Sequence, residues 1–318
     1  MEKLCSPFSP AYAFTMSPTP TQHSTGCAVD IRHVEPVSYQ VSPRSPRSPQ
    51  GRDEWKKTFS FTKAKLIGRG ASGIVFAIND ELVIKVFGRD PEAQSHLARE
   101  REIFEKLQGH ITSEYIIHYK EQWASGLVLE RLDGTLRDLL KTCVPSDSCQ
   151  AQPSSALTWS LECCRGFAFL HDNGIIHGDI GCQNVMVSTT KHAKICDFAG
   201  SKIGEEDAWV AYEIRSQHPD YSGDQPTITT EIFAIGSLLF EIWTRNSPYF
   251  GESDSLVKEK FREGDFPLDR ISSHKVMRIV YRCWTEGYRT VSEICEDLES
   301  IERSDELSSL PDQVLAPH

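Results

Sequence analysis

The chain has 318 residues, 39% of them apolar, which is enough for one sizeable domain or for two lobes plus tails. A formal net charge of -11 argues against nucleic acid as the main partner, and no apolar run approaches the roughly 18 residues of a membrane span. The ten cysteines include no Cys-x2-Cys pair, which disfavours a zinc site or a disulfide framework. Because no secretory apolar core is seen near the N-terminus, we expect an intracellular protein, cytoplasmic or nuclear or both.

Residues 1–57 are rich in Pro, Ser and Thr and are expected to form a disordered leader. Ser/Thr-Pro steps recur in this leader, at Ser6, Ser9, Ser17, Thr19, Ser42, Ser45 and Ser48. They are compatible with phosphorylation by proline-directed kinases and equally with an unmodified flexible segment. We expect one ordered domain over residues 58–303 and a flexible tail over residues 304–318.

A glycine-rich loop follows the first expected strand of this domain. Leu66-Ile67 runs into Gly68-Arg69-Gly70-Ala71-Ser72-Gly73, and the next residues are β-branched and aromatic. In dinucleotide-binding folds a Gly-x-Gly-x-x-Gly turn opens a helix, whereas this composition favours a second strand. The loop is therefore predicted to lie between two strands as a flap over phosphates.

The next strand, residues 82–87, contains a lysine on its apolar face. Lys85 shares that face with Val83 and Phe87. A buried ammonium is costly unless it is paired, so the sequence predicts a carboxylate partner.

A helix is predicted from the Asp90-Pro91 start signal to Gly109, and it supplies that partner. Steps of three and four place Glu100 as the one charge in an otherwise apolar line, facing Lys85; the alternative is that Glu100 reaches solvent. Glu102 is expected on the exposed face, where it can pair with Lys106, together with Ser95 and Arg99. Two further strands, residues 115–123 and 127–129, bring the expected sheet to five.

A hairpin over residues 177–200 is the most informative part of the sequence. Its strands, Val185–Val187 and Ala193–Cys196, flank a polar turn. Asp179 and Asn184 precede the first strand and Asp197 follows the second, so three oxygen-bearing side chains are expected to converge. Such a set suits a hard cation such as Mg²⁺, with one carboxylate left as a base.

These motifs resemble those of the protein kinase family. His177-Gly178-Asp179 stands for His-Arg-Asp, Asn184 for the catalytic-loop Asn, and Asp197-Phe198-Ala199-Gly200 for Asp-Phe-Gly. The His-Gly-Asp-Ile-Gly-Cys stretch is most similar to divergent kinases of filamentous fungi. The resemblance implies an α+β fold of two lobes: an antiparallel sheet with one helix at about 58–130, then a mainly helical lobe at about 134–303.

The resemblance also implies a site for ATP and Mg²⁺ and a protein substrate, with phosphate transferred to a hydroxyl, of Ser or Thr by expectation. Asp179 would accept the proton of that hydroxyl, Asn184 and Asp197 would hold Mg²⁺, and Lys85, paired with Glu100, would steady the phosphates. The expected nucleotide contacts are Gly68, Gly70, Gly73, Val75, Val83, Lys85, Leu129, Glu130 and Leu132. The sequence does not specify an oligomeric state.

Departures from the family pattern leave a second function open. Gly178 replaces the Arg that binds an activation-segment phosphate, and Gly181 replaces the Lys that Ser/Thr kinases place near the transferred phosphate. Gln183 is not the Arg of tyrosine kinases either. Ala199 alters the Asp-Phe-Gly turn, and Glu231, in a helix expected over residues 230–244, replaces an Asp that braces the catalytic loop. The alternative to an active enzyme is a pseudokinase that works as an interaction scaffold, either ATP-binding or nucleotide-free.

The activation segment, here residues 197–220, is expected to work without phosphorylation. Ser201 and Ser216 are its only aliphatic hydroxyls, and residues 201–210 are expected to be mobile. Without an Arg at position 178, Lys202 is the candidate substitute cation, and regulation is expected through the leader. The resemblance further pairs Arg289 with Asp220. Two last helices are expected over residues 273–284 and 290–303.

Overall fold

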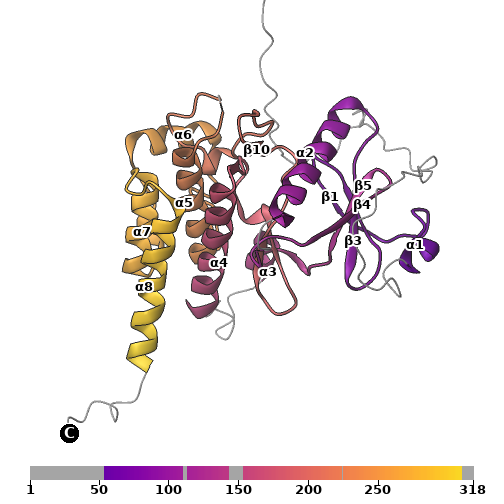
Figure 1. Cartoon of the computed structure of the whole chain (residues 1–318). Helices are drawn as coiled ribbons and strands as arrows, with labels where there is room; N and C mark the ends of the chain where they lie inside the picture. The colour runs from indigo at the N-terminus through magenta and orange to yellow at the C-terminus, as the bar shows by residue number, and fades with distance from the viewer. Residues whose placement is uncertain (1–53, 110–112, 143–152, 224, 310–318) are drawn as a thin grey trace, which may run out of the picture.

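The computed structural model describes residues 54–109, 113–142, 153–223 and 225–309, so most of the expected leader and the end of the tail lie outside the described residues. The described chain forms two lobes, a sheet with one long helix and a mainly helical lobe (Figure 1). This arrangement confirms the predicted α+β fold class.

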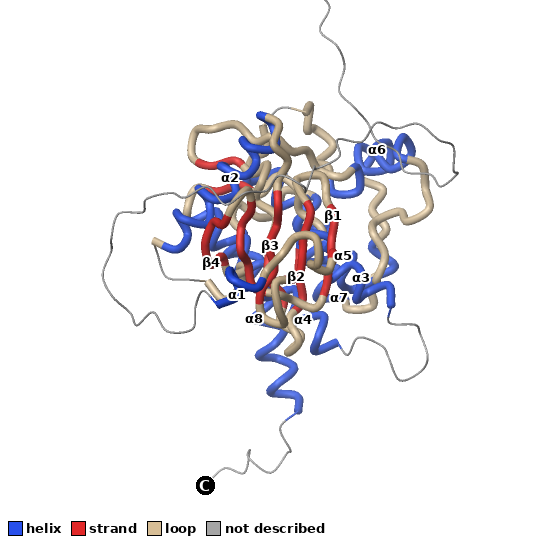
Figure 2. Tube along the Cα trace, turned by 90° about the vertical axis from the view of Figure 1, so that its right-hand side faces the viewer, coloured by secondary structure: helices blue, strands red, loops and turns tan. Residues whose placement is uncertain are grey.

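The small lobe is built on a five-stranded antiparallel sheet in the order β1-β2-β3-β5-β4. Its strands lie side by side in Figure 2, and their bounds are β1 Leu66–Arg69, β2 Ile74–Ala77, β3 Leu82–Val86, β4 Tyr119–Trp123 and β5 Gly126–Glu130. The register pairs Val75 with Lys85 and Lys85 with Leu127, which places Lys85 at the centre of the sheet. The expected strand over residues 115–123 begins later because residues 115–117 pair with Ile195 instead.

The two faces of this sheet are covered by different helices. Helix α2, Pro91–Gln108, packs with Val83, Phe87 and Leu129 on one face. As predicted, it begins at Asp90, whose side chain accepts a hydrogen bond from the Ala93 N–H, and Pro91 is its first residue.

The other face is covered by the short helix α1, Glu54–Thr58, which the sequence did not predict. Trp55 of α1 is buried with Phe76, Ile84 and Val128, and its ring lies edge-on to Trp123 at 5.2 Å. The described structure therefore starts inside the range that we expected to be disordered, because Trp55 has an aromatic partner on the sheet.

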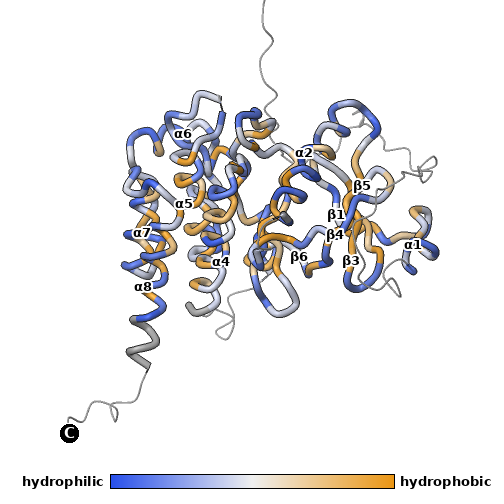
Figure 3. The backbone as a smooth tube through the Cα atoms, in the orientation of Figure 1, coloured by the Kyte–Doolittle hydropathy of each residue, from blue (hydrophilic) through white to orange (hydrophobic). Residues whose placement is uncertain are grey.

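The large lobe contains α3 Leu136–Thr142, α4 Pro153–Asp172, α5 Ile228–Thr244, α6 Asp254–Glu263, α7 His274–Trp284 and α8 Val291–Ser309. Helix α5 lies at its centre: a capping box at Thr227 and Thr230 starts it, and the residues from Thr230 to Ile242 are all buried. Apolar residues gather on the sheet and on α5 (Figure 3). Within the described residues, no helix combines the length and the apolar character that a membrane crossing requires.

The predicted hairpin is present where the two lobes meet. Strands β8 Val185–Val187 and β9 Ala193–Ile195 pair antiparallel, and β6 Gly134–Thr135 extends them. A second small pair joins β7 Ile175–Ile176 to β10 Lys202–Ile203, one on each side of the hairpin in sequence. Together these pairs fix the positions of residues 177–184 and 196–201, which contain the predicted chemistry.

Candidate active site

Lys85 lies at the centre of the site and contacts two carboxylates. Its Nζ is 2.6 Å from Glu100 Oε2 and 2.7 Å from Asp197 Oδ1, and the residue is 7% exposed. Burial alone would lower the pKa of Lys85, but the charges of Asp197 and Glu100 raise it above its ordinary value. The ammonium is therefore charged and joins strand β3, helix α2 and the segment after β9.

Glu100 faces inward from α2, whereas Glu102 is exposed. Glu100 is only 1% exposed and so does not reach solvent, the alternative that the sequence left open. Burial raises the pKa of Glu100, and the Lys85 ammonium opposes that rise. The helical spacing was wrong for Arg99, which was expected on the exposed face but is 3% exposed.

Asp179 and Asn184 are held together within the loop before β8. Asn184 Nδ2 donates to the backbone oxygen and to Oδ2 of Asp179, both at 2.8 Å, while the Asp179 N–H donates to His177 Nδ1. Burial raises the pKa of Asp179, against the effects of His177 and Asn184, and the charges of Glu213 and Asp197 add to the rise. A carboxylate with a raised pKa is suited to accept a proton.

Asp197 has the left-handed backbone conformation, with φ of 67°. Ser72, in the glycine-rich loop, donates to both of its carboxylate oxygens at 3.1 and 3.3 Å. Burial alone would raise the pKa of Asp197, but Lys85, His177 and Ser72 hold it below its ordinary value. The Asp197 carboxylate and the Asn184 Oδ1, which accepts no hydrogen bond from the described residues, form an oxygen set that fits Mg²⁺.

The glycine-rich loop is shaped by one sterically required glycine. A Cβ on Gly73 would lie 2.6 Å from the Val86 oxygen, so no larger residue fits beside β3. Gly70 donates its N–H to the Gly73 oxygen at 2.9 Å and has open space around its Cα. A Cβ on Gly68 would contact only the Val75 side chain, at an ordinary van der Waals distance of 3.6 Å. Gly68 and Gly70 therefore leave room for a ligand to approach the backbone.

The predicted adenine contacts gather near the connection between the lobes. Val83 and Leu129 are buried, while Val75 and Leu132 are half-buried against the same core. Neither the N–H nor the C=O of Leu132 has a backbone partner among the described residues, so both are available to a ligand.

Glu130 was also expected to contact the nucleotide, but its side chain is engaged elsewhere. Its carboxylate binds Lys194 at 2.6 Å and accepts the His118 N–H at 2.7 Å. The Glu130 N–H donates to the His118 oxygen at 2.9 Å, so only the backbone carbonyl of Glu130 is left for a nucleotide.

Glu231 of α5 braces the catalytic loop in place of the shorter Asp of the family pattern. It is fully buried and accepts the N–H groups of His177 and Gly178 at 3.1 and 2.7 Å. His171 Nε2 lies 2.8 Å from the same carboxylate. Both oxygens are used, so the longer side chain reaches the loop despite the substitution.

Gln183 occupies the space that Gly181 leaves open. A Cβ on Gly181 would lie 2.2 Å from Gln183 Oε1, and Gln183 Nε2 lies 3.4 Å from Asp179 Oδ1. The Gln183 Oε1 is buried and has no hydrogen-bond partner among the described residues. A neutral amide therefore lies beside Asp179, at the place where the family pattern supplies a cation.

The expected pairing of Arg289 with Asp220 is not found. Both residues are described, and no ion pair joins them; the Asp220 N–H donates to His218 Nδ1 instead. His218 in turn lies 3.5 Å from Glu286.

Two residues that contribute to the candidate site, Ser72 and Phe104, were not identified from the sequence. Ser72 was seen only as part of the glycine-rich loop, and its position at the loop tip was the available signal. Phe104 of α2 packs edge-on to Phe198 at 5.3 Å, and Phe198 packs against His177 at 5.5 Å. The fully buried Phe198 therefore links α2 to the catalytic loop.

Comparison with known proteins agrees with this geometry. Residues 61–316 match the model of the protein kinase domain. The chain is 31% identical over 150 residues to the serine/threonine-protein kinase PknB of Mycobacterium leprae, covering 44% of this chain and 23% of that protein. It is 26% identical over 281 residues to the mouse inactive tyrosine-protein kinase 7 (84% and 25%), and 23% over 284 residues to serine/threonine-protein kinase 12 of Arabidopsis thaliana (84% and 59%).

The chain thus spans between 23% and 59% of the length of these relatives. The family model, by contrast, covers most of this chain, from residue 61 to residue 316. The chain belongs to the protein kinase family.

Proposed function

We propose that the chain is an active protein kinase that transfers the γ-phosphate of ATP to a Ser or Thr hydroxyl of a protein, with Mg²⁺ as cofactor. The observation that carries this proposal is the joint contact of Lys85 with Glu100 at 2.6 Å and Asp197 at 2.7 Å. These three residues come from strand β3, helix α2 and the segment after β9, and phosphoryl transfer depends on their being positioned together.

Each polar residue then has a defined part. Asp179 accepts the proton of the substrate hydroxyl, and Asn184 fixes its orientation through two hydrogen bonds of 2.8 Å. Asn184 and Asp197 would hold the metal, and Lys85 would supply positive charge for the phosphates. When bound, Mg²⁺-ATP supplies the phosphoryl group and the neutralising cation.

The choice of Ser or Thr is supported by two relatives that are named serine/threonine-protein kinases, PknB of M. leprae and serine/threonine-protein kinase 12 of A. thaliana. In the loop itself, Gln183 replaces the Arg that tyrosine kinases carry.

A pseudokinase is the second candidate, and one observation favours it. Gln183 places a neutral amide, 3.4 Å from Asp179, where the family pattern has a cation. The mouse relative is itself named an inactive kinase. Under this alternative the chain acts through protein contacts, either with ATP bound or without nucleotide.

Two measurements on the purified chain separate the candidates. Mg²⁺-ATP is expected to raise the melting temperature, and Asp197→Asn to remove the metal-dependent part of the shift. Phosphotransfer is then scored beside Asp179→Asn. A shift with transfer supports the enzyme, and a shift without transfer supports an ATP-binding pseudokinase. No shift at millimolar ATP overturns the enzyme and favours a pseudokinase that binds no nucleotide.

A further inference from the structure

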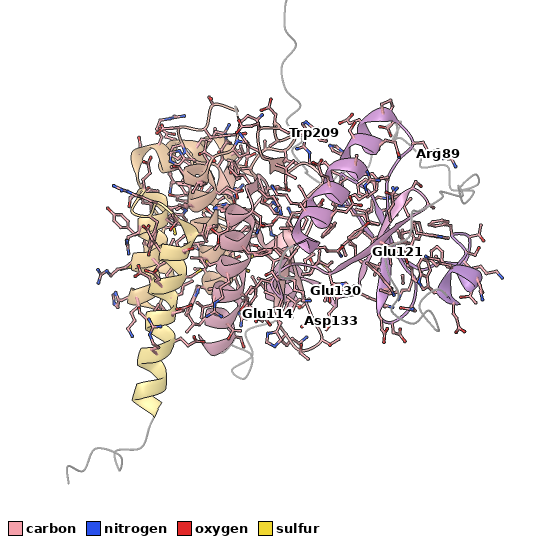
Figure 4. The ribbon with its side chains drawn as sticks, viewed as in Figure 1. Arg89, Glu114, Glu121, Glu130, Asp133 and Trp209 are labelled. Carbon is pink, nitrogen blue, oxygen red and sulfur yellow. The ribbon has the colours of Figure 1, made fainter. Side chains whose placement is uncertain are left out.

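Arg99, next to Glu100 on α2, contacts four residues of the activation segment. Its Nη1 donates to the Ser201 oxygen at 2.6 Å and to the Asp207 oxygen at 3.0 Å. Its Nη2 donates to Glu206 at 2.8 Å, and the guanidinium lies 4.0 Å from the centre of the Trp209 ring. We call this set the Arg99 contact. Figure 4 shows Trp209 beside α2.

The backbone oxygens and the ring stack contribute more to this contact than Glu206 does. The Glu206 side chain is 61% exposed, so its ion pair is screened by solvent. The Arg99 side chain is 2% exposed, and its bonds to Ser201 and Asp207 are charge-assisted. The planar guanidinium binds two carbonyls while it stacks on an indole, which a lysine cannot do.

The segment that Arg99 holds is packed directly on the catalytic loop. Ser201 is 1% exposed and donates its hydroxyl to the His177 oxygen at 2.9 Å. Gly178 has a φ of 79°, and a Cβ there would lie 2.8 Å from Val210. Val210 thus fills the place where a side chain at position 178 would begin. A larger residue at position 178, such as the Arg of the family pattern, would have to displace it.

Phosphorylation is a poor means of ordering this segment. Ser201 and Ser216 are 1% and 5% exposed, so neither hydroxyl is presented to another kinase. Lys202, the cation expected from the sequence, forms no ion pair within the described residues. Arg99 is a buried cation that contacts this segment at Ser201, Glu206 and Asp207.

We propose that Arg99 is a positioning residue that keeps the activation segment ordered without phosphate. It couples residues 201–209 to the helix turn that holds Glu100 against Lys85. The expected effect on catalysis rests on the proposed kinase function, whereas the effect on segment order does not.

The test is hydrogen exchange by mass spectrometry on the full chain, with the variants Arg99→Ala, Arg99→Lys and Trp209→Ala. The matched control is Arg101→Ala, on the same helix, because Arg101 binds Gln122 at 2.7 Å and does not contact the segment. We expect amide exchange over residues 201–210 to quicken about tenfold or more in Arg99→Ala, less in Arg99→Lys and Trp209→Ala, and not in Arg101→Ala.

The same spectra report whether Ser201 or Ser216 carries phosphate. Protection of residues 201–210 in molecules without that phosphate supports the proposal, and protection only in phosphorylated molecules overturns it. Unchanged exchange in Arg99→Ala, or an equal change in Arg101→Ala, also overturns it.

Catalysis gives a second readout. Arg99→Ala is expected to lower kcat at least tenfold without changing the melting shift produced by Mg²⁺-ATP. Arg99→Lys is expected to lower kcat by less than Arg99→Ala does. If wild type transfers no phosphate, the proposed function fails while the exchange experiment still decides the role of Arg99. An active wild type with an undiminished kcat in Arg99→Ala overturns the positioning role.

Discussion

Replacing Glu100 by glutamine removes the charge that faces Lys85 while keeping the shape of the side chain. Lys85 would keep its contact with Asp197 at 2.7 Å and lose a charged partner at 2.6 Å. With one carboxylate gone, the ammonium is drawn toward Asp197 and away from the phosphates. We therefore expect Glu100→Gln to lower kcat/KM for ATP.

The size of the loss follows from the contact. A hydrogen bond to a charged group contributes about 1.5–3 kcal/mol. At about 1.36 kcal/mol for each factor of ten, the expected loss in kcat/KM is about 10- to 150-fold. The free energy of unfolding should change less, because removing the buried charge of Glu100 also removes its desolvation cost.

The assay is initial-rate phosphotransfer over a range of ATP concentrations at fixed protein substrate, with unfolding followed in parallel. Glu102→Gln is the matched control: Glu102 is exposed, so its removal should change kcat/KM by no more than about twofold, equivalent to about 0.5 kcal/mol. Equal losses in the two variants, or a wild-type rate in Glu100→Gln, would refute the assigned role of the buried pair.

Three further outcomes are expected. Glu231→Gln should lower the free energy of unfolding by about 3 kcal/mol, because it disrupts a buried charged network, and should therefore lower the melting temperature by roughly 6–12 °C. A calorimetric shift below about 2 °C would contradict the bracing role. Because Asp179 must be ionised to accept a proton and its pKa is raised, the acid limb of a kcat/KM–pH profile should lie above the ordinary Asp value of about 3.9; a limb at or below that value speaks against Asp179 as the base. Gln183→Lys should raise kcat about tenfold and move the same limb to lower pH, since it adds a cation beside Asp179; an unchanged rate with an unmoved limb would contradict this.

The parts of the site that could be predicted are those determined by local patterns. Lys85 was placed by strand alternation, the start of α2 by Asp90-Pro91, and Glu100 by helical spacing. Each of these signals acts within a few residues along the chain. Asp179, Asn184 and Asp197 followed from a hairpin with a short turn, so their convergence could also be inferred.

The contacts that could not be predicted join residues far apart in sequence. Arg99 is 102 residues from Ser201, and spacing alone placed it on the exposed face. Trp55 forms a helix because Trp123 and Phe76 cover its ring, and propensity in a polar leader does not reveal that. The family resemblance placed Glu231 at the bracing position, but whether its longer side chain reaches two backbone N–H groups depends on where α5 packs, which local patterns do not determine.

The most direct test of catalysis is γ-phosphate transfer by the full chain to a generic protein substrate, with the modified residues located by mass spectrometry. We expect Mg²⁺-dependent transfer to Ser or Thr, reduced at least about 100-fold in Asp179→Asn, the scale of a lost general base. The control is a Mg²⁺-ATP melting shift that is the same in both proteins. No transfer by wild type despite that shift, or equal transfer by Asp179→Asn, would contradict the assignment of this site as a working kinase centre.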